Sequence, residues 1–163
     1  MSEESEITIG SLLRQHGQKL ATAESCTGGL LADHITNVPG SSDYFIGGVV
    51  AYAYEAKVAL LHVSWDTLRA HGAVSRETGI EMARGVRTAL GADIGISVSG
   101  IAGPGGGMPD KPVGTTWIGL SAREGDWTRK FVWIGDRIAN KEASAQAALQ
   151  FGLDYLNGKL ENG

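Results

Sequence analysis

The chain has few of the residues that form the disulfide bonds of exported proteins or coordinate metal ions. Its 163 residues include one cysteine, four prolines and four histidines. A single cysteine cannot form an internal disulfide or a metal site made of cysteines alone, so the composition is typical of a reducing, cytoplasmic location. The histidines lie in separate segments without the spacing of metal ligands, and the sequence predicts no metal site.

Long apolar runs and an excess of positive charge are also lacking. No run approaches the ~20 residues that cross a bilayer, and the acidic first ten residues have neither the positive start nor the apolar centre of a signal peptide. With 14 Lys and Arg against 18 Asp and Glu, the chain has no basic block that would hold nucleic acid by charge. We therefore expect no export, no membrane and no nucleic-acid partner, and a small molecule as the ligand.

Glycine is abundant instead, with 24 residues, roughly twice its usual share. A content of 42% hydrophobic and 20% charged residues is typical of one compact globular domain. There is no internal repeat, low-complexity linker or compositional break. The sequence thus predicts a single domain over residues 1–163.

Helical and strand patterns alternate along the chain. Helices are expected at residues 6–16, 30–36, 55–61, 65–70, 76–90 and 136–156. Strands are expected at residues 19–23, 44–52, 93–99, 114–122 and 127–134, the last two as a hairpin around residues 123–126. This order predicts an α/β protein, a single three-layer α/β/α domain with a mixed, mostly parallel sheet.

Two glycine-rich loops follow predicted strands, where α/β domains bind their ligands. The first, residues 23–29, places Ser25 before a glycine pair that opens a helix, whose free N–H groups suit an oxyanion or a phosphate. Ser25 suits a nucleophile, whereas Cys26 is expected to be an inert packed thiol. The alternative is that Ser25 or Thr27 only caps the helix.

The second loop, residues 100–112, contains five glycines and three prolines. Glycines let successive N–H groups converge on an anion, and prolines restrict the loop. It lacks the Gly-Lys-Ser/Thr ending of a Walker loop and the glycine spacing of a dinucleotide fingerprint. The alternative is a structural loop that covers the sheet edge.

Lys57 is the candidate general base. It lies in the apolar segment 49–61, where loss of hydration would lower its pKa and allow it to accept a proton. The alternative is an exposed helix lysine paired with Glu55 or with solvent.

Five motifs occur in the order found in the CinA C-terminal domain family. They are AESCTGG at 23–29, VPGSS at 38–42, GGVV with Tyr52 and Ala56-Lys57 at 47–57, GAVS at 72–75 and SGIAGPGGG at 99–107. The chain resembles this family over nearly its whole length. Members include stand-alone nicotinamide mononucleotide (NMN) deamidases, called PncC. The resemblance implies this stand-alone form, for which we expect no N-terminal nucleotide-pyrophosphatase-like domain of the kind found in full-length CinA proteins.

The resemblance implies a serine/lysine amidohydrolase of NAD salvage that converts NMN to nicotinic acid mononucleotide and ammonia without a cofactor. It implies Ser25 as the nucleophile, Lys57 as the base and Tyr52 as a supporting residue, in a protein that forms a homodimer. The residues expected to bind the substrate are Cys26, Thr27, Gly28, Gly29, Gly100, Ile101, Ala102, Gly103, Pro104, Gly105, Gly106 and Arg137.

The chain departs from the family pattern at three places. Ala53-Tyr54 stands where relatives often have Ser-Asn, Met108 stands where Thr is common, and Asn140-Lys141 stands where an apolar residue followed by Arg is frequent. Because of the Ala53-Tyr54 change, a non-catalytic nucleotide-binding or competence-associated module is one alternative. Hydrolysis of a phosphate ester on the glycine loops is another, although no cluster of carboxylates suggests a metal for it.

Overall fold

One five-stranded sheet forms the centre of the protein in a computed structural model that describes residues 2–161. Its strands are β1 (Leu20–Glu24), β2 (Phe45–Val50), β3 (Ile94–Gly100), β4 (Thr115–Ala122) and β5 (Gly125–Val132), in the order β2-β1-β3-β4-β5. Strands β2, β1 and β3 are parallel, β4 is antiparallel to β3, and β5 is antiparallel to β4. Four of the five strands therefore run in one direction, and the prediction of a mixed, mostly parallel sheet is confirmed.

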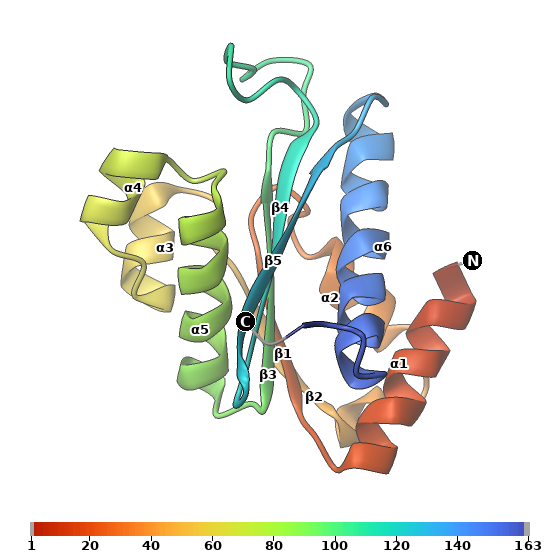
Figure 1. Ribbon diagram of the computed structural model, residues 1–163. Helices are drawn as coiled ribbons and strands as arrows, with labels where there is room; N and C mark the ends of the chain where they lie inside the picture. Colours follow the sequence, from red (N-terminus) through yellow and green to blue (C-terminus); the bar gives the residue numbers. More distant parts are fainter. Residues whose placement is uncertain (1, 162–163) are drawn as a thin grey trace.

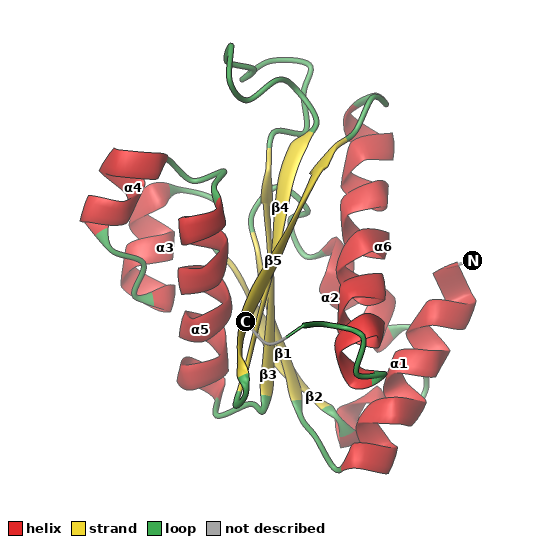
Figure 2. Ribbon diagram, in the orientation of Figure 1, coloured by secondary structure: helices red, strands yellow, loops and turns green. Residues whose placement is uncertain are grey.

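Helices cover both faces of the sheet (Figures 1 and 2). One face carries α1 (Ser2–His16), α2 (Leu30–Thr36) and α6 (Arg137–Leu156), and the other carries α3 (Tyr54–Leu61), α4 (Trp65–His71) and α5 (Arg76–Leu90). A short 3-10 turn, η1 (Ser41–Asp43), precedes β2. The three-layer α/β/α arrangement is confirmed.

Alternation along the strands divides the apolar side chains between two cores. In β1, Leu20 packs into the core under α1, α2 and α6, whereas Ala21 and Ala23 pack into the core under α3, α4 and α5. The second core is built largely of small or medium side chains, so its helices approach the sheet closely.

Glycines on α5 and β4 allow this close approach. A Cβ added to Gly85 would lie 1.9 Å from the carbonyl oxygen of Leu61 at the end of α3, and one added to Gly119 on β4 would lie 2.4 Å from the carbonyl oxygen of Gly79. Helix α5 is thereby held against both α3 and the sheet. Because α3 carries Lys57, this packing fixes the position of the candidate base.

Replacing Gly85 with Ala is expected to destabilise the protein by about 1 to 2 kcal/mol. Alanine favours a helix over glycine by up to about 1 kcal/mol, but forcing an extra carbon into a packed contact typically costs about 1–3 kcal/mol. Unfolding in urea measures the difference. Gly105→Ala is the control, because nothing lies within 4 Å of its added Cβ; equal stability of the two variants would contradict the packing argument.

Most element boundaries agree with the sequence prediction to within two residues. The largest difference is in α1, which begins at Ser2 rather than at residue 6, and β5 spans Gly125–Val132 rather than residues 127–134. Helix α5 begins after the Ser75 cap and ends at Gly91 as predicted. Strand β2, however, ends at Val50, two residues before the predicted end at Tyr52. The reason is that the carbonyl groups of Ala51 and Tyr52 turn away from the sheet to accept hydrogen bonds from Lys57.

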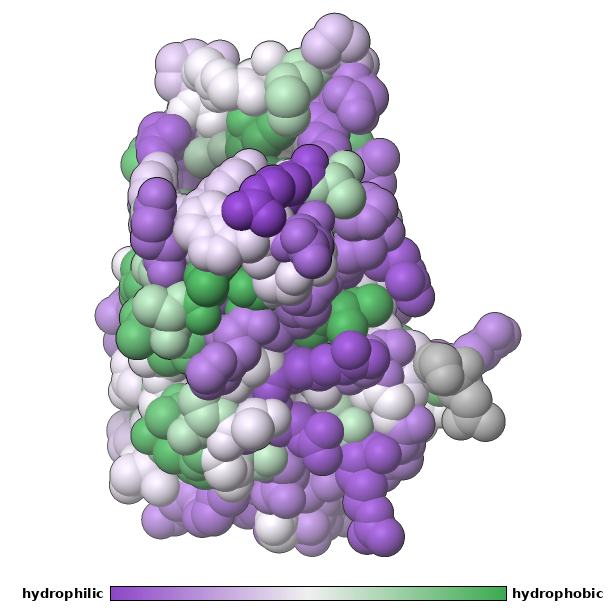
Figure 3. All heavy atoms as spheres, turned by 90° about the vertical axis from the view of Figure 1, so that its left-hand side faces the viewer, coloured by the Kyte–Doolittle hydropathy of each residue, from purple (hydrophilic) through white to green (hydrophobic). Residues whose placement is uncertain are grey.

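The outer side of α3, α4 and α5 mixes hydrophilic residues with small separate apolar areas (Figure 3). Within residues 2–161, no helix combines the length and the apolar character that crossing a membrane requires.

Candidate active site

Ser25 lies at the carboxyl end of β1, where the chain leaves the sheet for α2. Its N–H donates to the carbonyl oxygen of Val98 on β3 at 2.9 Å, which fixes the residue between two parallel strands. Gly28 and Gly29 then take left-handed conformations, with φ of 62° and 108°, and turn the chain into α2. The turn requires glycine at both positions because other residues rarely adopt these φ angles.

Lys57 reaches Ser25 from the opposite helical layer. Its Nζ lies 3.0 Å from the Ser25 Oγ and 2.9 Å from each of the carbonyl oxygens of Ala51 and Tyr52. The side chain is only 1% exposed, so the alternative of an exposed lysine paired with Glu55 is wrong. Burial lowers the pKa of Lys57 from 10.5 to about 8.

The three contacts of Lys57 define what the amine can do once it is neutral. A neutral amine has two N–H donors and one lone pair. The carbonyl oxygens of Ala51 and Tyr52 accept hydrogen bonds only, so they take the two donors. The lone pair is then left for the hydroxyl of Ser25, which donates its proton toward Nζ. This is the arrangement of a nucleophile with an adjacent general base.

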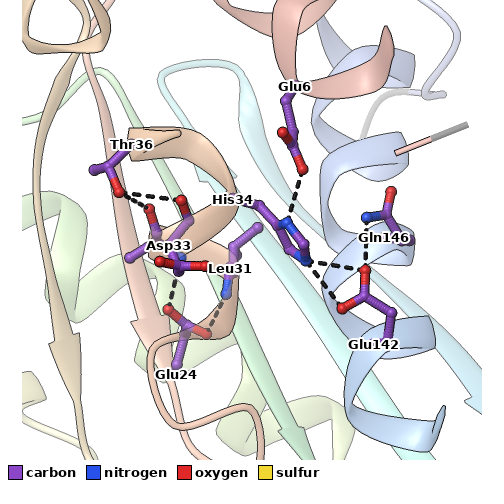
Figure 4. A network of polar contacts seen from close by, with 9 residues as sticks. Glu6, Glu24, Leu31, Asp33, His34, Thr36, Glu142 and Gln146 are labelled. Atoms are coloured by element: carbon purple, nitrogen blue, oxygen red, sulfur yellow. Dashed lines mark hydrogen bonds and ion pairs between the residues drawn. The ribbon is translucent and has the colours of Figure 1, made fainter. Parts of the chain in front are cut away.

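Glu24 is a buried residue beside Ser25 whose structural role the sequence reasoning missed. Its side chain is 1% exposed, and its carboxylate accepts a hydrogen bond from the Thr27 hydroxyl at 2.6 Å. The carboxylate also accepts from the Leu31 N–H at 2.8 Å and the Ala32 N–H at 3.0 Å (Figure 4). The first turn of α2 is thus capped from the preceding strand.

The hypothesis that Ser25 or Thr27 caps α2 is wrong. Gly29 occupies the N-cap position and no side chain caps from there, while the Thr27 hydroxyl is bonded to Glu24. The available signal was an acidic residue placed between a strand and a glycine turn. Glu24 lies further from the start of α2 than a usual N-cap residue does, so the N-cap patterns of the sequence do not identify it.

Ser25 and Lys57 open into a cavity of about 200 Å³. Seven of the predicted site residues line it: Ser25, Cys26, Tyr52, Lys57, Gly100, Ala102 and Arg137. The other predicted residues lie in the adjoining turns without lining this cavity: Thr27, Gly28, Gly29, Ile101, Gly103, Pro104, Gly105 and Gly106. Sequence reasoning missed three lining residues: Ala73, Val74 and Ser99. The motif at residues 72–75 was the available signal for two of them.

Tyr52 contacts the other site residues in two separate ways. Its main-chain carbonyl accepts from Lys57, while its side chain is 62% exposed and its hydroxyl accepts from Arg137 Nη2 at 3.2 Å. Arg137 also donates from Nη1 to the carbonyl oxygen of Gly103 at 2.7 Å. The pair joins the turn after β2 to the first turn of α6 beside the cavity.

The second glycine-rich loop extends beyond the ends of β3 and β4 (Figure 1). At its base, the Ile101 N–H donates to the carbonyl oxygen of Thr115 at 2.9 Å, and the Gly114 N–H donates to the carbonyl oxygen of Ile101 at 2.7 Å. Near its tip, Met108 and Lys111 exchange main-chain hydrogen bonds, and Lys111 Nζ donates to the carbonyl oxygen of His71. Both ends of the loop are therefore anchored.

Cys26 is a poor nucleophile in this setting. The side chain is 8% exposed, and burial raises the pKa of its thiol to about 11, so little thiolate exists near neutral pH. Among residues 2–161, no group of three or more His, Cys, Asp and Glu side chains is placed to hold a metal ion. Ser25 and Lys57 are the residues whose geometry supports chemistry.

Comparison with known proteins identifies the family of the chain that carries this site. The CinA C-terminal domain matches residues 2–156. The chain belongs to the CinA C-terminal domain family. CinA-like proteins of Salinibacter ruber and Chloroherpeton thalassium are 49% and 51% identical to it over 145 and 153 residues, which cover 89% and 91% of the chain. The chain spans only 35% and 36% of these two relatives.

Solved structures of the CinA superfamily share the whole fold. The CinA superfamily protein from Klebsiella pneumoniae has a TM-score of 0.93 at 35% identity, covering 97% of this chain and 99% of that one. The competence/damage inducible protein from Agrobacterium tumefaciens has a TM-score of 0.92 at 38% identity, covering 96% and 95%. The CinA fold described above is thus shared with proteins of similar length.

The buried amine of this CinA domain is expected to make stability depend on pH. Above pH 8 the folded Lys57 is neutral, whereas the unfolded lysine keeps its proton up to about its ordinary pKa of 10.5. The unfolded state then binds more protons, so stability rises with pH in this window. The free energy of unfolding of the wild type should increase by about 3 kcal/mol relative to Lys57→Met between these limits. Urea unfolding across the window measures it, and parallel curves would contradict the burial of an ionisable amine.

Proposed function

We propose that the chain is an amidohydrolase that converts NMN to nicotinic acid mononucleotide and ammonia. The observation that carries the proposal is the buried Lys57 Nζ, 3.0 Å from the Ser25 Oγ and held by two carbonyl oxygens. The choice of NMN rests on the resemblance to the deamidases of the family. The names of the similar proteins speak only of CinA-like and competence/damage-inducible proteins.

In the first half of the proposed reaction, Lys57 removes the hydroxyl proton of Ser25 as the Oγ attacks the carboxamide carbon. The pKa of about 8 leaves a useful fraction of neutral amine near pH 7. The tetrahedral intermediate then collapses, the C–N bond breaks, and Lys57 returns the proton to the departing nitrogen. Ammonia leaves and an ester to Ser25 remains.

In the second half, water hydrolyses the ester. Lys57, neutral again after protonating the ammonia, takes a proton from the attacking water, and the acid is released as Ser25 regains its hydroxyl proton. One water molecule is consumed and no cofactor is needed. The same amine thus serves both halves as base and acid.

The main chain beside Ser25 supports a proposal for the oxyanion hole. The N–H of Ser25 itself is occupied by Val98, so it does not serve. Among the described residues, no protein oxygen accepts from the N–H groups of Cys26 and Thr27. They follow the nucleophile directly, and one such donor is typically worth about 3 kcal/mol in the transition state. Of the two residues, Cys26 lines the cavity and Thr27 does not, so we assign the developing negative charge to the N–H of Cys26.

Residues beside the cavity suit a mononucleotide. The exposed ring of Tyr52 offers an aromatic surface, and the Arg137 guanidinium offers a charge for the 5′-phosphate. The phosphate would replace the Tyr52 hydroxyl as the partner of Arg137 Nη2. Arg137 Nη1 remains on the Gly103 carbonyl, which keeps the guanidinium in place.

Ser25→Ala is expected to reduce ammonia release from NMN by at least about 10³-fold, because it removes the only atom that forms the ester. Ammonia is measured with purified protein over a long incubation. Thr27→Ser is the matched control, since it keeps the hydroxyl that bonds Glu24. Undiminished release by Ser25→Ala would refute the nucleophile. A wild type that binds NMN by calorimetry without turnover would support a binding module instead.

Arg137→Gln is expected to raise KM for NMN by an order of magnitude or more, the usual scale for a lost charged hydrogen bond. KM for nicotinamide riboside, which lacks the phosphate, should change much less. Lys141→Gln is the control, because it removes a cation from the same helix without lining the cavity. Equal increases of KM for both substrates would show that Arg137 acts by shaping the loop rather than by holding phosphate.

A further inference from the structure

Asn140 is a buried polar residue on α6 that the reaction above does not use. It is 3% exposed. Its Nδ2 donates to the carbonyl oxygen of Ala102 at 3.0 Å, and its Oδ1 accepts from the N–H of Gly135 at 3.0 Å. Since one partner only accepts and the other only donates, the amide has a single satisfactory orientation.

The partner of Asn140 belongs to the cavity wall. Ala102 lines the cavity together with Ser25. Three successive residues at this end of the loop are held in different ways: Ile101 by the main chain of residues 114–115, Ala102 by Asn140, and Gly103 by Arg137. The two α6 side chains are three residues apart and so project from one side of the helix.

The hydrogen bond from Asn140 fixes a whole peptide group. The peptide between Ala102 and Gly103 is planar and trans, so turning its carbonyl toward Asn140 turns the Gly103 N–H to the opposite side. Without the amide donor, this buried carbonyl would lose its partner, and the peptide could rotate in a loop rich in glycine. The wall beside Ser25 would then lose its fixed shape.

We propose that Asn140 is a positioning residue of the Ser25 site. It holds the Ala102–Gly103 peptide in one orientation in the wall of the cavity where a substrate would react with Ser25. The proposal rests on the proposed function for its physiological reaction. It can be tested separately on the reactivity of Ser25 itself. A fluorophosphonate serves as the probe: the Ser25 Oγ bonds to phosphorus, fluoride leaves, and the hydroxyl proton passes to Lys57.

Asn140→Asp is the sharpest variant. It keeps the size of the side chain and the acceptor for Gly135, but replaces the donor to Ala102 with a carboxylate oxygen. The second-order rate of labelling at Ser25 should fall on the order of tenfold, the scale of one buried hydrogen bond. Ser97→Ala is the matched control: it deletes the buried bond from Ser97 to the Gly79 carbonyl, away from the cavity, and should label at the wild-type rate.

The pH dependence of labelling separates positioning from activation of the base. Asn140→Leu removes both hydrogen bonds without adding charge. It should lower the plateau rate while the midpoint stays near the wild-type value set by Lys57, about 8. A shifted midpoint would place the effect on Lys57 and overturn the proposal.

The remaining outcomes are also decisive. Wild-type labelling rates in Asn140→Asp, or an equal fall in Ser97→Ala, would overturn the positioning role, the latter because any lost buried bond would then suffice. Labelling that depends on Asn140 in a protein that releases no ammonia from NMN would refute the proposed function and leave the positioning role standing. A wild type that is not labelled at Ser25 would overturn both.

Discussion

The burial of the Lys57 amine is the constraint on which the rest of the site depends. An ammonium group removed from water is costly unless every donor is satisfied. In this protein the N–H groups of Lys57 Nζ are hydrogen-bonded to two consecutive main-chain carbonyl groups and to the hydroxyl of Ser25. Strand β2 has to end at Val50 so that these carbonyls can turn, and α3 has to lie where α5 holds it through Gly85. The end of strand β2 and the packing of α3 are therefore both needed for the three hydrogen bonds of Lys57.

The opposite layer has its own polar anchor. His34 on α2 lies 2.7 Å from Glu6 on α1 and 3.0 Å from Glu142 on α6, and Glu24 holds the first turn of the same helix (Figure 4). Helix α2, which follows the Ser25 turn, is thereby tied to α6, which carries Arg137 and Asn140. The Ser25 turn and the cavity wall therefore belong to one connected layer.

The sequence predicted the elements well because their signals are local. The apolar repeat and the flanking Ser75 and Gly91 define α5, and the glycine pair defines the turn before α2. It did not reveal Glu24, Ser99 or the role of the Tyr52 carbonyl. These depend on contacts between separate segments or on which way a peptide group faces, and neither leaves a periodic signal. Lys57 was ambiguous for the same reason: its apolar neighbours along the chain are compatible with either exposure or burial.

The geometry also bears on the unusual Ala53-Tyr54 pair. Lys57 is oriented by the main-chain carbonyls of Ala51 and Tyr52, which any side chains at positions 53 and 54 leave unchanged. Ala53 sits at the N-cap of α3 in an extended conformation without a side-chain cap, and the Tyr54 ring packs 6.4 Å from that of Trp65. The Ala53-Tyr54 pair therefore bears on the cap of α3 and on its packing against Trp65, while the contact between Lys57 and Ser25 is made by other residues.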